Sequence, residues 1–442
     1  MTLRTFQFWL LATVLASSLH APAAAASKPD PAFVLEEICD PVGQIPFRSG
    51  QAPPGMVEIQ GVGAGPFNPG CWETNQLNWV SESRRPLLAP RMGGVFRNIY
   101  APSAVEDGAG WRFFYAAWDG VDTVNDRVYS ANTPDFIDFY GRHTVIEHGV
   151  FMHVSNINVQ RSEDGALHAI ATALVGGRQA NKPVYFLSPD GKNWNGSPEP
   201  CTAGISNIVA MDGYPAYDEG DENGANVLLR DNGKWALYFT NWRDPGKCYR
   251  AEGDTPAHFK LAGLALNTSH AVNDVKKFRL AGRDCYVMAL HKKGDVTGAN
   301  DNDKLWFSLS PDGKTFGPEQ RMPGARDEAD RYIFSVGFLA RKDRILGVLY
   351  GAGASERCER NQIFAHWLQK RVVLTARREY TRGNGLQFEA AGALGPDRQW
   401  FRLPHGATFE GTITVYAEDG VTQLGTRPVA LEPGVAYRLA WK

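Results

Sequence analysis

The chain has 442 residues, of which 43% are hydrophobic and 21% charged, and its formal net charge at pH 7 is −2. So balanced a charge gives no reason to expect nucleic acid or an anionic membrane as a partner. The 46 glycines and an aromatic content of 11% suit a large globular protein rich in tight turns and packed sheet faces.

The first residues have the pattern of a secretory signal peptide. Arg4 precedes an apolar run from Phe6 to Leu19, and small residues follow at Ala23–Ser27. A positive start, a short apolar stretch and small residues at a cleavage site are typical of such a leader, and the run is too short for a comfortable membrane span. We expect residues 1–26 to be removed and the mature chain, with a net charge of −3 once Arg4 is lost, to be secreted or periplasmic. An uncleaved anchor is the alternative.

Residues 27–94 are rich in proline and glycine and are interpreted as a strap that lies against the main fold. A repeated pattern follows. The stretch from Phe151 to Trp194 predicts three short strands bounded by turn residues, with a fourth strand expected after Trp194. Similar stretches recur with a period of roughly 55–65 residues, long enough for a four-stranded propeller blade. They begin near Ala101, Asn226, Asp274 and Phe334.

One such sheet cannot bury both of its faces, so each repeat needs neighbours. The sequence therefore predicts an all-β protein with a five-bladed β-propeller over residues 95–374. Short alternating strands in residues 375–442 indicate a small β-sandwich docked on the ring, either a structural appendage or a carbohydrate-binding module.

Six cysteines are scattered along the chain without a Cys-x-x-Cys pair that would indicate zinc or redox chemistry. In an oxidising compartment an even number favours disulfides. We expect Cys39–Cys71 to hold the strap and Cys201–Cys248 to join neighbouring blades, although six cysteines allow about 15 connectivities. Buried free thiols are the alternative.

Polar side chains near the starts of the innermost strands should converge at one mouth of the channel. A ring of amides, histidines and carboxylates there would suit a polyhydroxylated ligand, with Trp118, Tyr214 and Trp242 as flat faces for sugar rings. The substrate-binding candidates are Asn98, Tyr100, His153, Asn156, Asn158, Asn226, His270 and Arg331.

Two motifs resemble the blade endings of known enzymes. Ser188-Pro-Asp-Gly-Lys-Asn-Trp194 and Ser310-Pro-Asp-Gly-Lys-Thr-Phe316 are similar to the Ser-x-Asp-Gly-x-x-Trp endings of five-bladed glycoside hydrolases. Those enzymes are the arabinanase/β-xylosidase type and the related invertase/levansucrase type. Ala101-Pro-Ser, followed by the aromatic strand that begins at Trp111, also resembles their first blade. The resemblance covers about residues 95–374.

The resemblance implies a general-base Asp in blade one, a pKa-tuning Asp in blade two and a general-acid Glu in blade three. Ala101 and Asn156 occupy the first two positions here, and Glu222 lies close to the third. Glycoside hydrolysis needs two carboxyl groups across the scissile bond. We therefore predict Glu222 as the acid, its pKa raised by neighbouring acids, and Asp274 as base or nucleophile. Asp212 is the reserve for either role.

No cofactor is predicted. The acidic run from Asp218 to Glu222 could hold Ca²⁺, which prefers clustered oxygen ligands, although it lacks the spacing of an EF-hand loop. Signatures of serine hydrolases, phosphate-binding loops and zinc proteases are absent from the sequence.

These patterns favour a secreted glycoside hydrolase that acts on a polysaccharide or oligosaccharide. A non-catalytic carbohydrate-binding propeller is one alternative, because two of the family's carboxylates are replaced. An envelope protein that uses the ring as a protein-binding platform is another. The sugar, the linkage and the oligomeric state stay open.

Overall fold

A computed structural model describes most of the chain. The described residues are 33–38, 56–59, 79–82, 86–90, 98–118, 125–176, 180–214, 223–241, 244–280, 283–292, 303–322, 324–325, 328–356, 360–376, 389–393, 395–396, 399–402, 408–417, 422–432 and 435–441. The expected leader, residues 1–26, lies outside them. Within the described part of the chain, no helix has the length and apolar character needed to cross a membrane.

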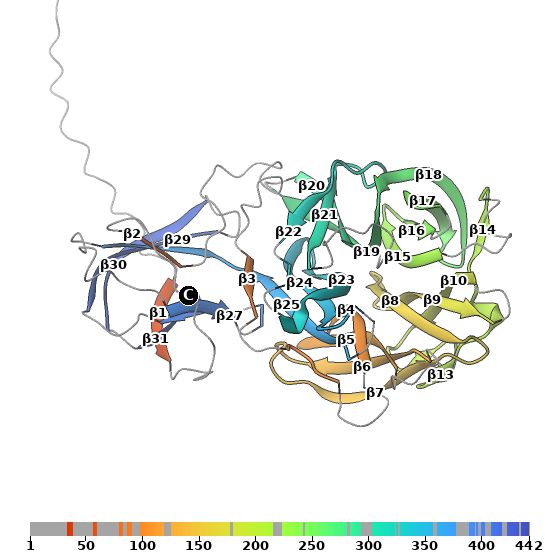
Figure 1. Cartoon of the computed structure of the whole chain (residues 1–442), viewed down its shortest axis with the longest axis horizontal. Coiled ribbons are helices and arrows are strands. Elements are labelled where there is room, and N and C mark those ends of the chain that lie inside the picture. Colours follow the sequence, from red (N-terminus) through yellow and green to blue (C-terminus); the bar gives the residue numbers. More distant parts are fainter. Residues whose placement is uncertain are drawn as a thin grey trace, which may run out of the picture.

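Five antiparallel sheets are arranged about one axis, which confirms the predicted all-β, five-bladed propeller (Figure 1). Blade one is β4 (Asn98–Asp107), β5 (Gly110–Trp118), β6 (Arg127–Thr133) and β7 (Tyr140–Glu147). Blade two is β8 (His153–Arg161), β9 (Leu167–Val175) and β10 (Ala180–Ser188). Blade three is β15 (Asn223–Asp231), β16 (Lys234–Asn241), β17 (Gly246–Thr255) and β18 (His258–Thr268), with β14 (Ala210–Asp212) at its outer edge.

Blade four is β19 (His270–Leu280), β20 (Arg283–Lys292), β21 (Leu305–Ser310) and β22 (Gln320–Met322). Blade five is β23 (Tyr332–Arg341), β24 (Arg344–Gly353), β25 (Gln362–Leu368) and β3 (Trp79–Ser81). The strap therefore supplies the outer strand of the last blade, where Trp79 pairs with Leu368. The inner strands β4, β8, β15, β19 and β23 contact one another in that order, and β23 contacts β4, so the ring is closed.

Blade two differs from the expectation of a fourth strand after Trp194. The chain instead makes a short hairpin of β11 (Asn193–Trp194) and β12 (Ser197–Pro198), and β13 (Cys201–Thr202) then pairs in parallel with β7 of blade one. The chain is held in this position by a partly buried polar contact. The Glu199 carboxylate accepts a hydrogen bond from the Trp194 indole at 2.6 Å and pairs with Arg112 of blade one. This contact draws the chain from one blade to its neighbour.

The two blade-ending motifs form the same turn. The Asp190 carboxylate accepts the backbone N–H groups of Lys192 and Asn193 at 2.8 and 2.7 Å, and these bonds lower the pKa of Asp190 to about 2. Asp312 makes the equivalent bonds in blade four. An Asp side chain that bonds its own backbone two residues on is a common turn device, so the residues that carry the family resemblance have a structural role here.

Two further four-stranded sheets lie beside the propeller (Figure 1). One contains β1 (Phe33–Ile38), β31 (Ala436–Trp441), β28 (Gln399–Arg402) and β27 (Glu389–Ala393), in that order. The other contains β2 (Met56–Ile59), β26 (Arg371–Ala376), β29 (Phe409–Tyr416) and β30 (Gln423–Leu431). Both sheets take an edge strand from the strap. The buried Glu82 carboxylate connects the parts by accepting the Trp367 indole N–H and the Gly395 backbone N–H at 2.8 and 2.9 Å.

The predicted disulfide between Cys201 and Cys248 is wrong, because both are free, buried thiols. They belong to different cores, Cys201 among the apolar residues between blades one and two and Cys248 among those between blades three and four. Cys39, Cys71 and Cys358 lie outside the described residues, so the Cys39–Cys71 pairing stays a prediction.

Gly337 provides a test of how closely the inner strands approach. A Cβ atom there would lie 2.4 Å from the carbonyl oxygen of Pro102 in blade one, so Gly337→Ala must push β23 and β4 apart. We expect the free energy of unfolding to fall by about 1–3 kcal/mol, measured by urea denaturation. Gly176→Ala is the matched control, because a Cβ atom there meets open space. Equal stability of both variants would contradict the close approach.

Candidate active site at the mouth of the channel

All five inner strands are interrupted near their starts by a register shift of the β-bulge type. The shifts lie between Tyr100 and Ser103, Ser155 and Asn158, Asn223 and Asn226, Val272 and Asp274, and Ile333 and Ser335. A bulge re-aims side chains and is common next to active sites. The end of the channel at which the inner strands start, here called the mouth, is therefore surrounded by five irregular strand segments.

Two of these bulges hold a non-glycine residue in the left-handed region, Ala101 at φ 50° and Asn156 at φ 50°. For alanine this conformation costs roughly 1–2 kcal/mol, which the surrounding structure must supply. These are also the positions at which the family resemblance implies carboxylates. Ala101 and Asn156 therefore have strained backbone conformations, although neither side chain can act as an acid or a base.

Side chains of the inner strands accept backbone N–H groups of the next blade. Because adjacent blades share no β-ladder at the axis, the edge N–H groups of each inner strand need such acceptors. The bonds join Ser103 to Val159 at 3.0 Å, Asn158 to Leu228 at 3.2 Å, Asp274 to Phe338 at 2.8 Å and Ser335 to Ala101 at 2.7 Å. Among the described residues, such bonds join four of the five interfaces between blades.

Asp274 is the centre of this network. Its Oδ2 accepts the Phe338 N–H, and its Oδ1 accepts the Asn158 amide at 2.8 Å and the Lys276 ammonium at 2.9 Å. The side chain is buried. Asp274 therefore joins blades two, four and five and lies between the mouth and the far end of the channel. Its predicted role as base or nucleophile stays a prediction, and its contacts are those of a structural group.

A second buried carboxyl group lies at the mouth, at Asp126, just before β6. Its Oδ1 accepts the Tyr100 hydroxyl at 2.9 Å, and its Oδ2 lies 4.0 Å from Nδ1 of His153. That distance is too long for a hydrogen bond. The Tyr100 ring in turn meets Trp118 edge-on at 6.4 Å. Among the described residues, three buried polar atoms of this group have no hydrogen-bond partner, namely Asp126 Oδ2, His153 Nδ1 and Trp118 Nε1.

Burial controls the protonation of this group. It raises the pKa of Asp126 to about 7, against the opposing hydrogen bond from Tyr100. Burial also lowers the pKa of His153 to about 4. Both side chains are therefore neutral over a wide range below pH 7, with the proton on the carboxyl group rather than on the imidazole. A perturbed acid with an unsatisfied oxygen is a functional-site candidate.

The other predicted ligands are more dispersed. Asn98 accepts the Asn361 N–H at 2.7 Å and Asn226 donates to Thr172 at 2.9 Å, both in the interior. His270 pairs with Glu319 at 2.7 Å and stacks on Trp306. Arg331 is exposed and pairs with Glu328. Asn156, on its bulge, is partly exposed at the mouth.

Asp212 does not lie at the mouth. It belongs to β14, which pairs with the outermost strand of blade three, and its exposed carboxylate meets His258 at 2.8 Å. Glu222, Trp242 and the whole acidic run from Asp218 lie outside the described residues. The part of the chain that the structure describes contains no group of three or more His, Cys, Asp or Glu side chains that could hold a metal ion.

The fold matches five-bladed β-propeller glycoside hydrolases at low sequence identity. One similar structure is a protein of Bacteroides thetaiotaomicron provisionally assigned as a glycosidase, with 13% sequence identity and a TM-score of 0.49 over 68% of this chain and 99% of that chain. Another is an α-L-arabinofuranosidase of Podospora anserina, with 13% identity and a TM-score of 0.47 over 66% of this chain and 96% of that chain. A third is a β-fructofuranosidase of Bombyx mori, with 9% identity and a TM-score of 0.45 over 84% of this chain and 91% of that chain. No protein-family model matches the chain, and no curated protein is significantly similar to it. Likeness at this level assigns no reaction, substrate or residue role.

Because Asp274 is the centre of the hydrogen-bond network, we expect its replacement to lower the free energy of unfolding substantially. Asp274→Asn leaves the Lys276 ammonium without its buried counter-ion, so we expect about 3–5 kcal/mol less stability by urea denaturation. Asp212→Asn, at an exposed acid, should change stability by less than about 0.5 kcal/mol. An Asp274→Asn variant as stable as the wild type but without activity would instead support the catalytic role.

The Asp126–His153 pair predicts opposing pH dependences. Asp126 holds its proton up to about pH 7 when folded but only to about 3.8 when unfolded, so its contribution to stability is present below 3.8 and is lost progressively as pH rises from there to about 7. The His153 contribution is present above 6.5 and is lost as pH falls towards 4. Relative to the wild type, the stability of Asp126→Asn should rise with pH between 4 and 6.5, by up to about 1.4 kcal/mol per unit. His153→Gln should show the reverse slope. Urea unfolding across this range measures both, and two unchanged profiles would contradict the assignment.

Proposed function

We propose that the protein is a carbohydrate-active enzyme that cleaves a glycosidic bond at the mouth, with Asp126 as the proton donor. The observation that supports this most directly is the carboxyl group of Asp126, which keeps its proton up to about pH 7 and has one unsatisfied oxygen. Glycoside hydrolysis requires such an acid to protonate the leaving oxygen. The amide of Asn156 and the rings of Tyr100 and Trp118 add hydrogen-bonding and flat apolar groups nearby.

Access to the acid requires a small rearrangement. Asp126 is buried, whereas Trp118 and His153 are partly exposed. A rotamer change of either side chain would open the unsatisfied Oδ2 to a sugar oxygen, and the substrate would then occupy the space that the side chain leaves. The neutral imidazole of His153 can accept a sugar hydroxyl through its unsatisfied Nδ1.

The second carboxyl group is assigned to Glu222. Of the three acids predicted from the sequence, Asp274 uses both oxygens to hold the blades and Asp212 lies at an outer edge. That leaves Glu222, just before the inner strand of blade three, as the group that activates water or attacks the sugar. The acid role moves from Glu222 to Asp126 in this proposal.

Export belongs to the same proposal. The charged start at Arg4, the apolar run and the small residues before Ser27 support a leader removed after residue 26. A mature enzyme in the periplasm or the medium would meet polysaccharide directly. The strands of residues 375–442 are assigned to a small β-sandwich that the strap strands complete.

A non-catalytic carbohydrate-binding propeller is the second candidate. It is favoured by the two strained bulges, at which Ala101 and Asn156 hold the positions of the family's catalytic carboxylates. In that case the mouth would bind sugar through amides and aromatic faces without turnover.

The test is release of reducing sugar from arabinans, xylans, fructans and bacterial exopolysaccharides by the purified mature chain. Asp126→Asn and Glu222→Gln should each lower kcat by about 10²–10⁴-fold, the usual contribution of a positioned acid or base. Asp212→Asn is the control and should keep wild-type activity. Full activity of Asp126→Asn would overturn the acid assignment, whereas sugar binding on a glycan array without turnover of any polymer would favour the second candidate.

A further inference from the structure

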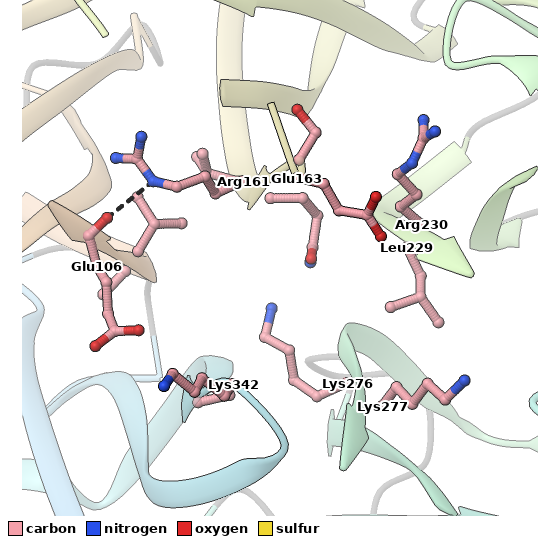
Figure 2. Close-up of a pocket in the computed structure, with 14 residues that line it drawn as sticks. Glu106, Arg161, Glu163, Leu229, Arg230, Lys276, Lys277 and Lys342 are labelled. Carbon is pink, nitrogen blue, oxygen red and sulfur yellow. Dashed lines mark hydrogen bonds between the residues drawn. The ribbon is translucent and has the colours of Figure 1, made fainter. Parts of the chain in front are cut away.

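The far end of the channel contains a cavity of about 380 Å³. It is lined by the second halves of all five inner strands and by turn residues after β8 and β23, and Figure 2 shows the labelled side chains around it. The lining includes neither Asp126 nor Tyr100 or His153, so the cavity is separate from the candidate active site.

Basic side chains outnumber acidic ones in the lining. The bases are Arg161, Arg230, Lys276, Lys277 and Lys342, and the acids are Glu106 and Glu163. Several of these charges are already used, since Arg161 pairs with Asp107, Lys277 with Asp231 and Glu106 with Arg341.

The lining side chains that are not in ion pairs carry a net positive charge. Within the described part of the chain, Arg230 and Lys342 form no ion pair, and Glu163 forms none either. Arg230 rests over the Trp235 ring at 5.1 Å. Figure 2 shows Glu163 and Arg230 on the same side of the cavity and the Lys276 ammonium directed towards its middle.

Two buried donors lack enough acceptors. Lys276 is about nine-tenths buried, and its ammonium has three protons, of which the bond to Asp274 at 2.9 Å uses one. The side-chain amide nitrogen of Gln160, also in the lining, is buried and has no hydrogen-bond partner among the described residues. A buried donor without an acceptor costs free energy. Both of these donors line the same cavity.

We propose that this cavity binds a small-molecule oxyanion, a phosphate, sulfate or carboxylate group, with Lys276 and Gln160 as donors and Arg230 and Lys342 as flanking charges. An oxyanion supplies several acceptors at once and suits charge-assisted bonds from Lys and Arg. The volume leaves room for the rest of a small molecule, such as a sugar acid or a sugar phosphate. This site does not depend on the activity proposed for the mouth.

Isothermal titration of the purified full chain with inorganic phosphate, sulfate and glucuronate tests the proposal, at low ionic strength because salt screens exposed charges. Saturable binding of at least one anion is expected. Glu163→Gln should tighten it by threefold or more, because this exposed acid repels the ligand. Gln160→Met should weaken it by threefold or more, and Lys276→Met by tenfold or more. If Lys276→Met does not fold, the other two variants decide.

Lys277→Met is the matched control. This residue borders the same cavity but pairs with Asp231, so its loss should change the affinity by less than twofold. Asp126→Asn should bind the anion as the wild type does, which separates this site from the proposed active site. No binding of any of the three anions at millimolar concentration, or binding unchanged by Gln160→Met and Glu163→Gln, would overturn the proposal. Binding of glucuronate alone would assign the site to sugar acids, and of phosphate or sulfate alone to tetrahedral oxyanions.

Discussion

The inner strands of this propeller are joined by side chains rather than by a shared backbone ladder. Each inner strand has a neighbour in its own blade, but its other edge faces the next blade near the axis. The N–H groups there must be paired, because a buried unpaired donor costs free energy comparable to a lost hydrogen bond. Ser103, Asn158, Asp274 and Ser335 supply the acceptors. The ring is thus closed by polar contacts at its centre and by apolar packing further out.

This constraint divides the channel into two ends with different chemistry. The acceptor network fills the middle, with Asp274 linking three blades. At the mouth the strands bulge, and a buried acid keeps an unsatisfied oxygen. At the far end the second halves of the strands surround a cavity whose lining contains more basic than acidic side chains. The Asp126 group at the mouth and the lining of the cavity at the far end share no residue, so the two ends of one closed ring present different side chains.

The sequence was sufficient to predict the five-bladed ring because the signals for it are local. Turn residues, alternating strands and the two Ser-Pro-Asp-Gly motifs recur at a regular spacing, and each sheet needs neighbours. Long-range pairings were less accessible. Nothing near Trp194 shows that the chain moves to blade one, since the cause is a contact between Glu199 and Arg112, 87 residues apart. Likewise, the pairing of strap strands with the C-terminal sheets depends on contacts across most of the chain.

The candidate site was harder to predict, for a physical reason. Polar residues at the starts of inner strands can face a ligand or can accept N–H groups of the next blade, and both uses require the same residue types. Asn158 and Asp274, both predicted at the site, accept backbone N–H groups of the next blade, and their predicted roles at the site stay predictions. Asp126 was missed because it precedes β6, a middle strand, where a carboxylate resembles an ordinary turn residue. Only the Tyr100 contact and the surrounding burial distinguish it.

The cost of Asp126 argues for a role in proton transfer. A pKa raised from 3.8 to about 7 corresponds to roughly 4 kcal/mol of disfavoured ionisation. Asparagine in the same place could accept the Tyr100 hydroxyl and would carry no such cost, so the hydrogen bond alone does not account for an acid. Unlike the amide, the carboxyl group carries a proton that it can give up near neutral pH. An energetically costly arrangement of this kind persists only where the surrounding structure holds it in place. The side-chain acceptors that join the blades of the closed ring provide this support.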